Sequence, residues 1–168
     1  MNSFFKAVLL IGVMGLAACT NPDRYGAGGP GGAGGIDSSG LGANDPDSPA
    51  YFQQTIGDKV HFAVDQHTLT AEAQATLARQ AEWLIGHPSY SALIEGHADE
   101  QGTRIYNINL GERRANAVRE FLISRGVAGN RITTISYGKE RPLALCSQES
   151  CYAQNRRAVT VITAGAGV

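Results

Sequence analysis

The sequence predicts an α+β domain in which two helices pack on one face of a small mixed sheet, preceded by a flexible tether. Three observations predict this. Strand-like and helix-like segments alternate after residue 51, a glycine-rich segment precedes them, and a short apolar run opens the chain. The expected order of elements is β-α-β-α-β-loop-β, and such alternation favours two layers packed around one core.

The N-terminal segment has the pattern of a signal peptide. One lysine precedes an apolar run from Ala7 to Ala18, which is too short to span a bilayer and suits a signal-peptide core. The run ends in "LAAC", Leu16 to Cys19, which resembles the cleavage box of bacterial lipoproteins. That resemblance implies a signal peptide over residues 1–18 and lipid on Cys19. Because no Asp follows the cysteine, it also implies sorting to the outer membrane. An ordinary secretion signal with a chance cysteine is the alternative.

A glycine-rich linker is expected between the lipid and the folded domain. Residues 20–50 consist mainly of Gly, Pro, Ser and Asp and offer almost nothing to bury. A flexible chain of this length reaches about 30 Å on average and about 100 Å when stretched. The sequence therefore divides into a signal peptide at 1–18, a lipidated cysteine and linker at 19–50, and a folded domain at 51–168.

Hydrophobic periodicity places the elements of the folded domain. The first helix is expected to begin after Thr70, which can cap it, and to end at Gly86 and Pro88. Gly126 is expected to close the second helix. The expected strands span 59–64, 90–96, 131–138 and 156–163, and the second helix spans 106–125.

One arginine is out of place in the second helix. On a helical wheel with Leu110 at zero, the apolar residues fall between about −20° and 120°, and Arg114 falls at about 40°. A guanidinium cannot discharge itself by losing its proton, so a buried Arg114 requires an opposite charge or a bound anion. The alternative is that its stem packs on the core while its head reaches water.

The densest polar segment is the loop "HADEQGTR" that leads into this helix. It carries Asp99 and ends beside a helix N-terminus, where free backbone N–H groups favour anions. Two arrangements with Arg114 are possible. Asp99 pairs with Arg114 as a structural bridge, or the two side chains bind opposite halves of a zwitterionic ligand, whose amine and carboxylate would satisfy both.

Three segments carry a resemblance to a known family. "EGHADEQGTRIYNINLGERRANAVREFL", "SYGKERP" and "NRRAV" resemble the OmpA-like peptidoglycan-binding domain, and the match covers nearly all of residues 55–163 in order. With the lipoprotein box and the linker, the chain resembles the OmpA-like lipoprotein family of the Tol–Pal system. The resemblance implies that Asp99 and Arg114 hold the amino and carboxylate groups of meso-diaminopimelate in the cell-wall stem peptide.

The same resemblance implies further peptidoglycan-binding residues. They are Phe62 and Asp65 beside the pocket, Glu100, Gly102 and Thr103 in the loop, Asn107 and Leu110 on the helix, and Arg156 at the rim. Phe62 could instead belong to the core, and Asn107 could simply brace the helix. Because Arg156 and Arg157 are neighbours on a strand, only one of them can meet the pocket.

The resemblance also implies partners and a location. The expected partners are peptidoglycan, the lipid of the outer membrane, and the Tol proteins, including a periplasmic β-propeller protein that competes for an overlapping surface. The domain would face the periplasm and help the envelope constrict at cell division. A module that binds only proteins is the rival interpretation.

The cysteine count agrees with an exported protein. Lipid on Cys19 leaves Cys146 and Cys151, which lie five residues apart in "LCSQESCY". In an oxidising periplasm such a pair predicts a disulfide. A metal site is the alternative, but no second Cys or His pair accompanies them.

Composition and motifs argue against other classes of function. The net charge is −1 and no basic stripe is interleaved with aromatic residues, so no nucleic acid is expected as a partner. The sequence has no G-x-S-x-G and no paired metal-ligand spacing among its histidines. We therefore expect no catalytic residues, no metal and no cofactor. A cell-wall hydrolase is the remaining enzymatic alternative, which sacculus digestion would test.

Overall fold

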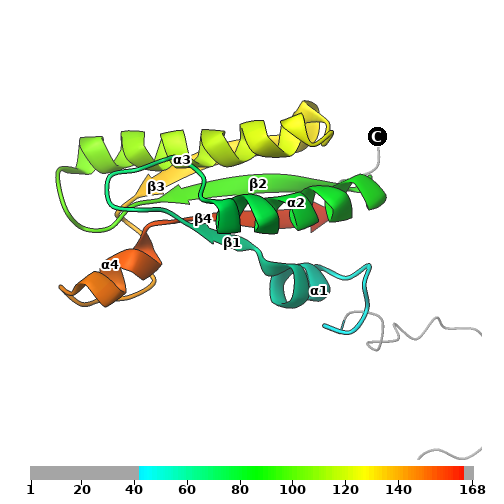
Figure 1. The fold of residues 1–168 in the computed structure, drawn as a ribbon, viewed down its shortest axis with the longest axis horizontal. Coiled ribbons are helices and arrows are strands. Elements are labelled where there is room, and N and C mark those ends of the chain that lie inside the picture. The colour runs from blue at the N-terminus through cyan, green and yellow to red at the C-terminus, as the bar shows by residue number, and fades with distance from the viewer. Residues whose placement is uncertain (1–41, 165–168) are drawn as a thin grey trace, which may run out of the picture. The chain divides into compact units, whose positions relative to one another are not determined.

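The structure is a computed structural model and describes residues 42–164 (Figure 1). The predicted signal peptide, Cys19 and most of the predicted linker lie outside the described residues. Within the described range, no helix has the length and apolar character needed to cross a membrane. The elements in chain order are α1 (Pro49–Tyr51), the π-helical turn η2 (Phe52–Gly57), β1 (Lys59–His61), α2 (Ala71–Gly86), β2 (Tyr90–His97), α3 (Arg104–Ser124), the 3-10 turn η3 (Gly129–Arg131), β3 (Ile132–Gly138), α4 (Glu149–Asn155) and β4 (Arg157–Ala164).

The four strands form one mixed sheet in the order β1-β4-β2-β3. β2 runs parallel to β3 and antiparallel to β4, and β1 pairs antiparallel with β4. α2 and α3 cover one face of the sheet, as Figure 1 shows. The predicted α+β class and the packing of two helices on one face of a mixed sheet are confirmed.

The core between the two helices and the sheet is mainly aliphatic, with the aromatic side chains of Phe52, Phe62 and Trp83 also buried in it. Leu77 and Leu84 of α2, Ile94 of β2, and Val118 and Leu122 of α3 are all buried in it. Burial of each such side chain stabilises the fold by about 1.5–3 kcal/mol.

One polar side chain is buried among these aliphatic residues. Gln80 of α2 donates to Gly57 O at 2.6 Å and accepts from Thr160 Oγ1 of β4 at 2.8 Å. Because both ends of its amide are paired, Gln80 joins α2 to the sheet without leaving an unsatisfied group.

Two glycines bring α3 into backbone contact with β2. A Cβ on Gly96 would lie 1.9 Å from Gly111 O, and a Cβ on Gly111 would lie 2.4 Å from Ser136 Oγ of β3. Neither position has room for a side chain. This close approach places the helix turn that carries Arg114 directly over the end of β2.

The folded domain begins before the predicted boundary at residue 50. Trp83 of α2 donates its indole N–H to Pro46 O at 2.7 Å, and His87 Nε2 lies 2.9 Å from an Asp47 carboxylate oxygen. Ser48 caps α1 by accepting from Tyr51 N. The segment from residue 42 to residue 50, which the sequence assigns to the linker, therefore packs on the C-terminal end of α2.

The first strand is shorter than predicted. The expected range was 59–64, but the pairing of β1 with β4 ends at His61. The chain then turns through Asp65, a non-glycine residue with φ 55°, and the carbonyls of Ala63 and Gln66 accept hydrogen bonds from Arg114. The alternating pattern could not reveal this turn, because a distant side chain holds it.

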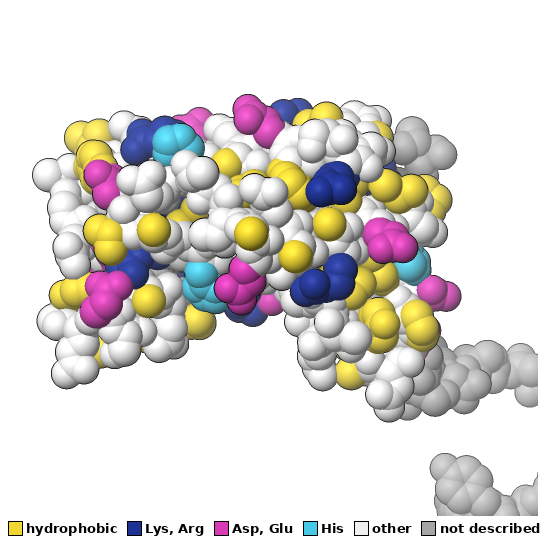
Figure 2. All heavy atoms as spheres, viewed as in Figure 1, with side chains coloured by type: hydrophobic (Ala, Val, Ile, Leu, Met, Phe, Trp, Pro, Cys, Tyr) yellow, Lys and Arg dark blue, Asp and Glu magenta, His cyan; other side chains and the backbone are white. Residues whose placement is uncertain are grey.

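The other predicted elements agree with the structure to within two residues. Thr70 caps α2 as expected, by accepting from Ala73 N. The seven-residue helix α4 was not predicted and lies where the sequence indicates a loop. Figure 2 shows the surface from the same side, with a hollow below the sheet between the parts of the surface formed by α4 and α1.

Candidate functional site

A cleft of about 290 Å³ lies beside the start of α3. Three segments that are distant in sequence form its walls: the turn after β1, the loop after β2, and the first two turns of α3. The lining residues are Val64, Asp65, Asp99, Gln101, Gly102, Tyr106, Asn107 and Leu110. Of the predicted site residues, Asp65, Asp99, Gly102, Asn107 and Leu110 therefore line one cavity.

Arg114 lies one helical turn beyond Leu110 and is completely buried. Its Nε donates to Gln66 O at 2.8 Å, Nη1 donates to His97 O at 2.8 Å, and Nη2 donates to Ala63 O at 3.2 Å. The guanidinium also stacks over the Phe62 ring, 5.1 Å from its centroid. The prediction that this arginine is buried is confirmed, and the alternative that its head reaches bulk water is wrong.

The charge of Arg114 is compensated without a hydrogen-bonded carboxylate among the described residues. Burial lowers the pKa of Arg114 to about 10, the nearby Asp99 carboxylate counteracts this, and Arg156 adds to it. The side chain is therefore still a cation at neutral pH. A guanidinium has five N–H donors, and the three carbonyls account for one on each nitrogen.

Asp99 pairs with a different arginine from the one considered in the sequence. Its Oδ2 lies 3.1 Å from Arg156 Nη1, and its Oδ1 accepts from Gln101 N at 3.2 Å. Of the two arrangements considered from the sequence, the structural bridge from Asp99 to Arg114 is therefore not formed. The reason lies in the topology. β4 pairs with β2, and this pairing brings Arg156, just before β4, next to Asp99, just after β2.

Arg156 is held by three elements. It is 4% exposed, and it donates Nε to Phe62 O at 3.2 Å in addition to its contacts with Asp99 and Glu149. Although burial opposes its charge, the hydrogen bonds to Glu149 and Asp99 raise the pKa of Arg156 above its ordinary value. Arg157, the first residue of β4, diverges from Arg156 and donates to Arg141 O at 3.2 Å.

Like Arg114 and Arg156, three other predicted residues do not line the cleft. Phe62 is buried in the core beneath Arg114. Thr103 caps α3 by accepting from Tyr106 N at 3.2 Å. Glu100 faces a neighbouring groove, which Pro142 and Leu145 also line.

Asn107 both lines the cleft and braces it, because its Nδ2 donates to Gln101 O at 2.8 Å. Sequence reasoning missed Val64, Gln101 and Tyr106 as lining residues. The Tyr106 hydroxyl donates to the Asp65 carboxylate across the cleft, which raises the pKa of Tyr106. Position on the first turn of α3, one residue before Asn107, is the signal that could have identified Tyr106.

The predicted disulfide between Cys146 and Cys151 is formed, with their Cα atoms 5.7 Å apart. It closes the loop in front of α4. Among residues 42–164, no group of three His, Cys, Asp or Glu side chains is placed to hold a metal ion.

The fold and the cleft define a class of protein: a two-layer α+β domain with a cleft and a buried Asp99–Arg156 ion pair at the carboxyl end of a central strand. The chain belongs to the OmpA family, which it matches over residues 61–156.

Its relatives include peptidoglycan-associated lipoproteins. The one from Rhizobium meliloti (strain 1021) is 50% identical over 160 residues, covering 95% of this chain and 88% of the relative. The one from Haemophilus influenzae (strain ATCC 51907 / DSM 11121 / KW20 / Rd) is 40% identical over 162 residues, covering 95% and 98%.

Solved structures agree with the fold. The crystal structure of the peptidoglycan-associated lipoprotein from Burkholderia pseudomallei matches with a TM-score of 0.64 and 40% identity, over 72% of this chain and 98% of that one. The C-terminal domain of Helicobacter pylori MotB matches with a TM-score of 0.60 at 22% identity, over 65% of this chain and 86% of that one, which shows a shared fold alone.

Proposed function

We propose that this chain is an outer-membrane lipoprotein whose folded domain binds peptidoglycan non-covalently through diaminopimelate of the stem peptide. Membership of the OmpA family and the names of its relatives support peptidoglycan as the ligand class. Lipid on Cys19 would anchor the chain, and the glycine-rich segment behind it would give the domain its reach. The protein binds the wall and carries out no chemistry on it.

The observation that carries this proposal is a pair of opposite charges: Asp99 lines the cleft, and Arg114 is buried one helical turn beyond the lining residue Leu110. Arg114 is a buried cation that no carboxylate among the described residues neutralises by a direct hydrogen bond, and the Asp99 carboxylate lies in the wall of the cleft. The free end of diaminopimelate carries an ammonium and a carboxylate on one carbon. In the proposed complex the ammonium faces Asp99 and the carboxylate faces Arg114.

The other residues have distinct roles in this proposal. Asp65 and Asn107 add polar contacts at the rim, Leu110 packs on the methylene chain of the ligand, and Gly102 leaves room for it. Phe62 supports Arg114 from the core, Arg156 pairs with Asp99, and Thr103 caps the start of α3, while Glu100 faces the neighbouring groove.

We further propose that the domain faces the periplasm and works with the Tol proteins, as envelope integrity and division require. Exposed apolar side chains beside the cleft support a protein partner there. Ile105 is 76% exposed at the start of α3, and Leu145 is 88% exposed in the groove next to Glu100. A partner on this rim would compete with the wall.

Sedimentation with purified sacculi tests the proposal. Arg114→Ala should weaken co-sedimentation by at least about tenfold, because truncating one member of a buried charged site removes several kcal/mol. Arg113→Ala is the matched control, since Arg113 is exposed and adjacent on the same helix. Asp99→Asn provides a second variant that keeps the three carbonyl contacts of Arg114 intact.

Circular dichroism should show that each variant remains folded. Unchanged binding by both Arg114→Ala and Asp99→Asn would rule out this cleft as the site. Release of soluble wall fragments by the wild-type chain would rule out a binder without catalysis.

A further inference from the structure

Arg156 stands between two carboxylates that come from different elements. Asp99, from the loop after β2, contacts its Nη1 at 3.1 Å. Glu149, the first residue of α4, accepts from Nη2 and lies 3.4 Å from Nη1. The Asp99 and Arg156 side chains are buried, whereas the Glu149 side chain is 65% exposed. Glu149 therefore reaches in from the surface to the back of the site.

The charges explain why a second carboxylate matters. The buried set of Asp99, Arg114 and Arg156 contains two cations and one carboxylate, so its net charge is positive. A net positive site attracts a carboxylate but repels an ammonium. Exposed Asp65 faces the ligand from the cleft rim, while Glu149 compensates Arg156 from behind.

We propose that Glu149 is a positioning residue: it holds Arg156 and offsets its charge, so that Asp99 keeps its negative potential toward a ligand amine. This inference rests on the proposed function. It explains why the same site would prefer a ligand with a free amine over one whose amine is blocked. Glu149 contacts Arg156 and is not among the residues that line the cleft, so its effect on the ligand passes through Arg156.

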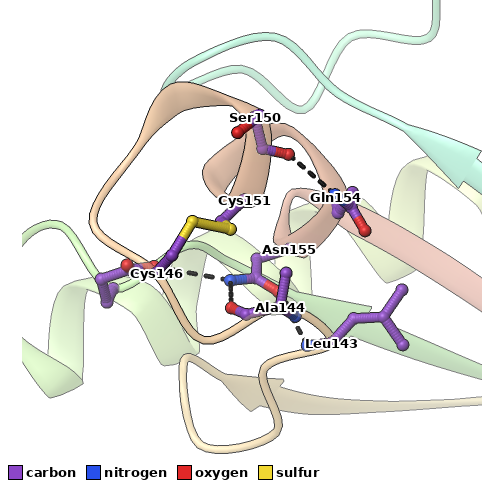
Figure 3. Close-up of a disulfide and its surroundings, with 8 residues drawn as sticks. Leu143, Ala144, Cys146, Ser150, Cys151, Gln154 and Asn155 are labelled. Carbon is purple, nitrogen blue, oxygen red and sulfur yellow. Dashed lines mark hydrogen bonds between the residues drawn. A yellow bond between two sulfur atoms is a disulfide. The ribbon is translucent and has the colours of Figure 1, made fainter.

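The loop in front of α4 is built to hold Glu149 in place. A helix of seven residues is too short to be stable alone. The disulfide ties Cys151 of α4 to Cys146, and Asn155 at the end of α4 accepts from Leu143 N at 2.7 Å and from Ala144 N at 3.0 Å (Figure 3). These contacts fix the helix that presents Glu149.

The test compares two synthetic stem peptides binding to the full lipoprotein in detergent. One peptide ends in diaminopimelate with its free amine, and the other has that amine acetylated. Glu149→Gln should weaken binding of the free-amine peptide about three- to fivefold, the range for a partly exposed charge, and leave the acetylated peptide unaffected. The preference for the free amine should fall by the same factor, and 1 M salt should reduce the difference, because exposed charges are screened.

Glu140→Gln is the matched control. Glu140 pairs with exposed Arg104 at 3.1 Å, so this variant removes the same charge without touching Arg156. It should keep the wild-type preference. The double variant Cys146→Ser/Cys151→Ser should lower the preference in the same direction as Glu149→Gln, because it releases α4.

The outcomes separate this inference from the proposed function. If the wild type binds neither peptide, both fail. If the wild type binds and Glu149→Gln keeps its preference, only the role of Glu149 is overturned. Equal weakening of both peptides by Glu149→Gln, or the same loss in Glu140→Gln, would also overturn it, since either result indicates a general structural or charge effect.

Discussion

The buried histidine at the end of β2 should make the stability of this domain fall at mildly acidic pH. His97 is 2% exposed and its ring packs against Tyr137, with the centroids 5.5 Å apart. Neither ring nitrogen has a hydrogen-bond partner among the described residues. Burial, together with nearby Arg157 and Arg141, lowers the pKa of His97 from 6.5 to about 4. His97 is therefore neutral at pH 7, although Nε2 lies 3.7 Å from the Glu95 carboxylate.

The sign and size of the effect follow from the lowered pKa. Between pH 6.5 and about 4 the unfolded chain binds a proton at His97 that the folded chain does not bind, so protonation favours unfolding. The contribution of neutral His97 to the free energy of unfolding is fully present above pH 6.5, and about 3 kcal/mol of it is lost by pH 4. At pH 5 the loss is about 2 kcal/mol. The His97 carbonyl accepts a hydrogen bond from Arg114, so protonation of the His97 ring would also disturb the position of Arg114.

Urea denaturation at pH 7.5 and pH 5 measures this loss. In His97→Gln, which has a similar volume and does not titrate, the drop in unfolding free energy between the two pH values should be smaller by about 2 kcal/mol. Comparing pH values within each variant cancels any effect of the substitution on packing. His67→Gln is the control, because His67 is exposed. An equal drop in the wild type and His97→Gln would refute the reasoning.

Three further predictions concern packing, the disulfide and the anchor. Gly111→Ala should destabilise the domain by about 1–3 kcal/mol in thermal melts, despite the better helix propensity of Ala, since the new Cβ would lie 2.4 Å from Ser136 Oγ; Gly86→Ala, with open space around it, should not. Oxidised protein should show no free thiol from Cys146 and Cys151, and their replacement by Ser should lower stability by about 2 kcal/mol; two reactive thiols would contradict the bond. Cys19→Ser should yield protein without lipid by mass spectrometry, and persistent tight membrane fractionation would exclude lipid as the anchor.

The hydrogen bonds of Arg114 hold the candidate site together in the absence of a ligand. Its three carbonyl partners come from the turn after β1 and from the last residue of β2, so one side chain ties two separate segments to α3. A cation held by carbonyls is positioned before any ligand arrives. Preorganisation of this kind reduces the ordering that binding requires.

Local pattern was sufficient for most of the fold. Helical periodicity placed Arg114 on the apolar face of its helix, and the structure buries it there. Thr70 and Gly126 bounded the helices as expected, because capping depends only on neighbouring residues. The short spacing of Cys146 and Cys151 was likewise enough to predict their bond.

The early end of β1 and the helix α4 could not be predicted in the same way. Residues 62–64 alternate like a strand, yet their backbone turns away from the sheet. The reason is that the carbonyls of Ala63 and Gln66 accept hydrogen bonds from Arg114, which lies 51 and 48 residues further along the chain. α4 is too short to have a periodic pattern, and distant contacts from Asn155 and the disulfide hold it.

The sequence by itself placed a cation on the apolar face of α3 and a carboxylate loop before it. Only the tertiary structure decided which charges meet: Asp99 pairs with Arg156, and Arg114 is bound by carbonyls. The physical reason is range. The face that a helical residue presents follows from local geometry, whereas the partner of a buried charge depends on which strands lie side by side in the sheet.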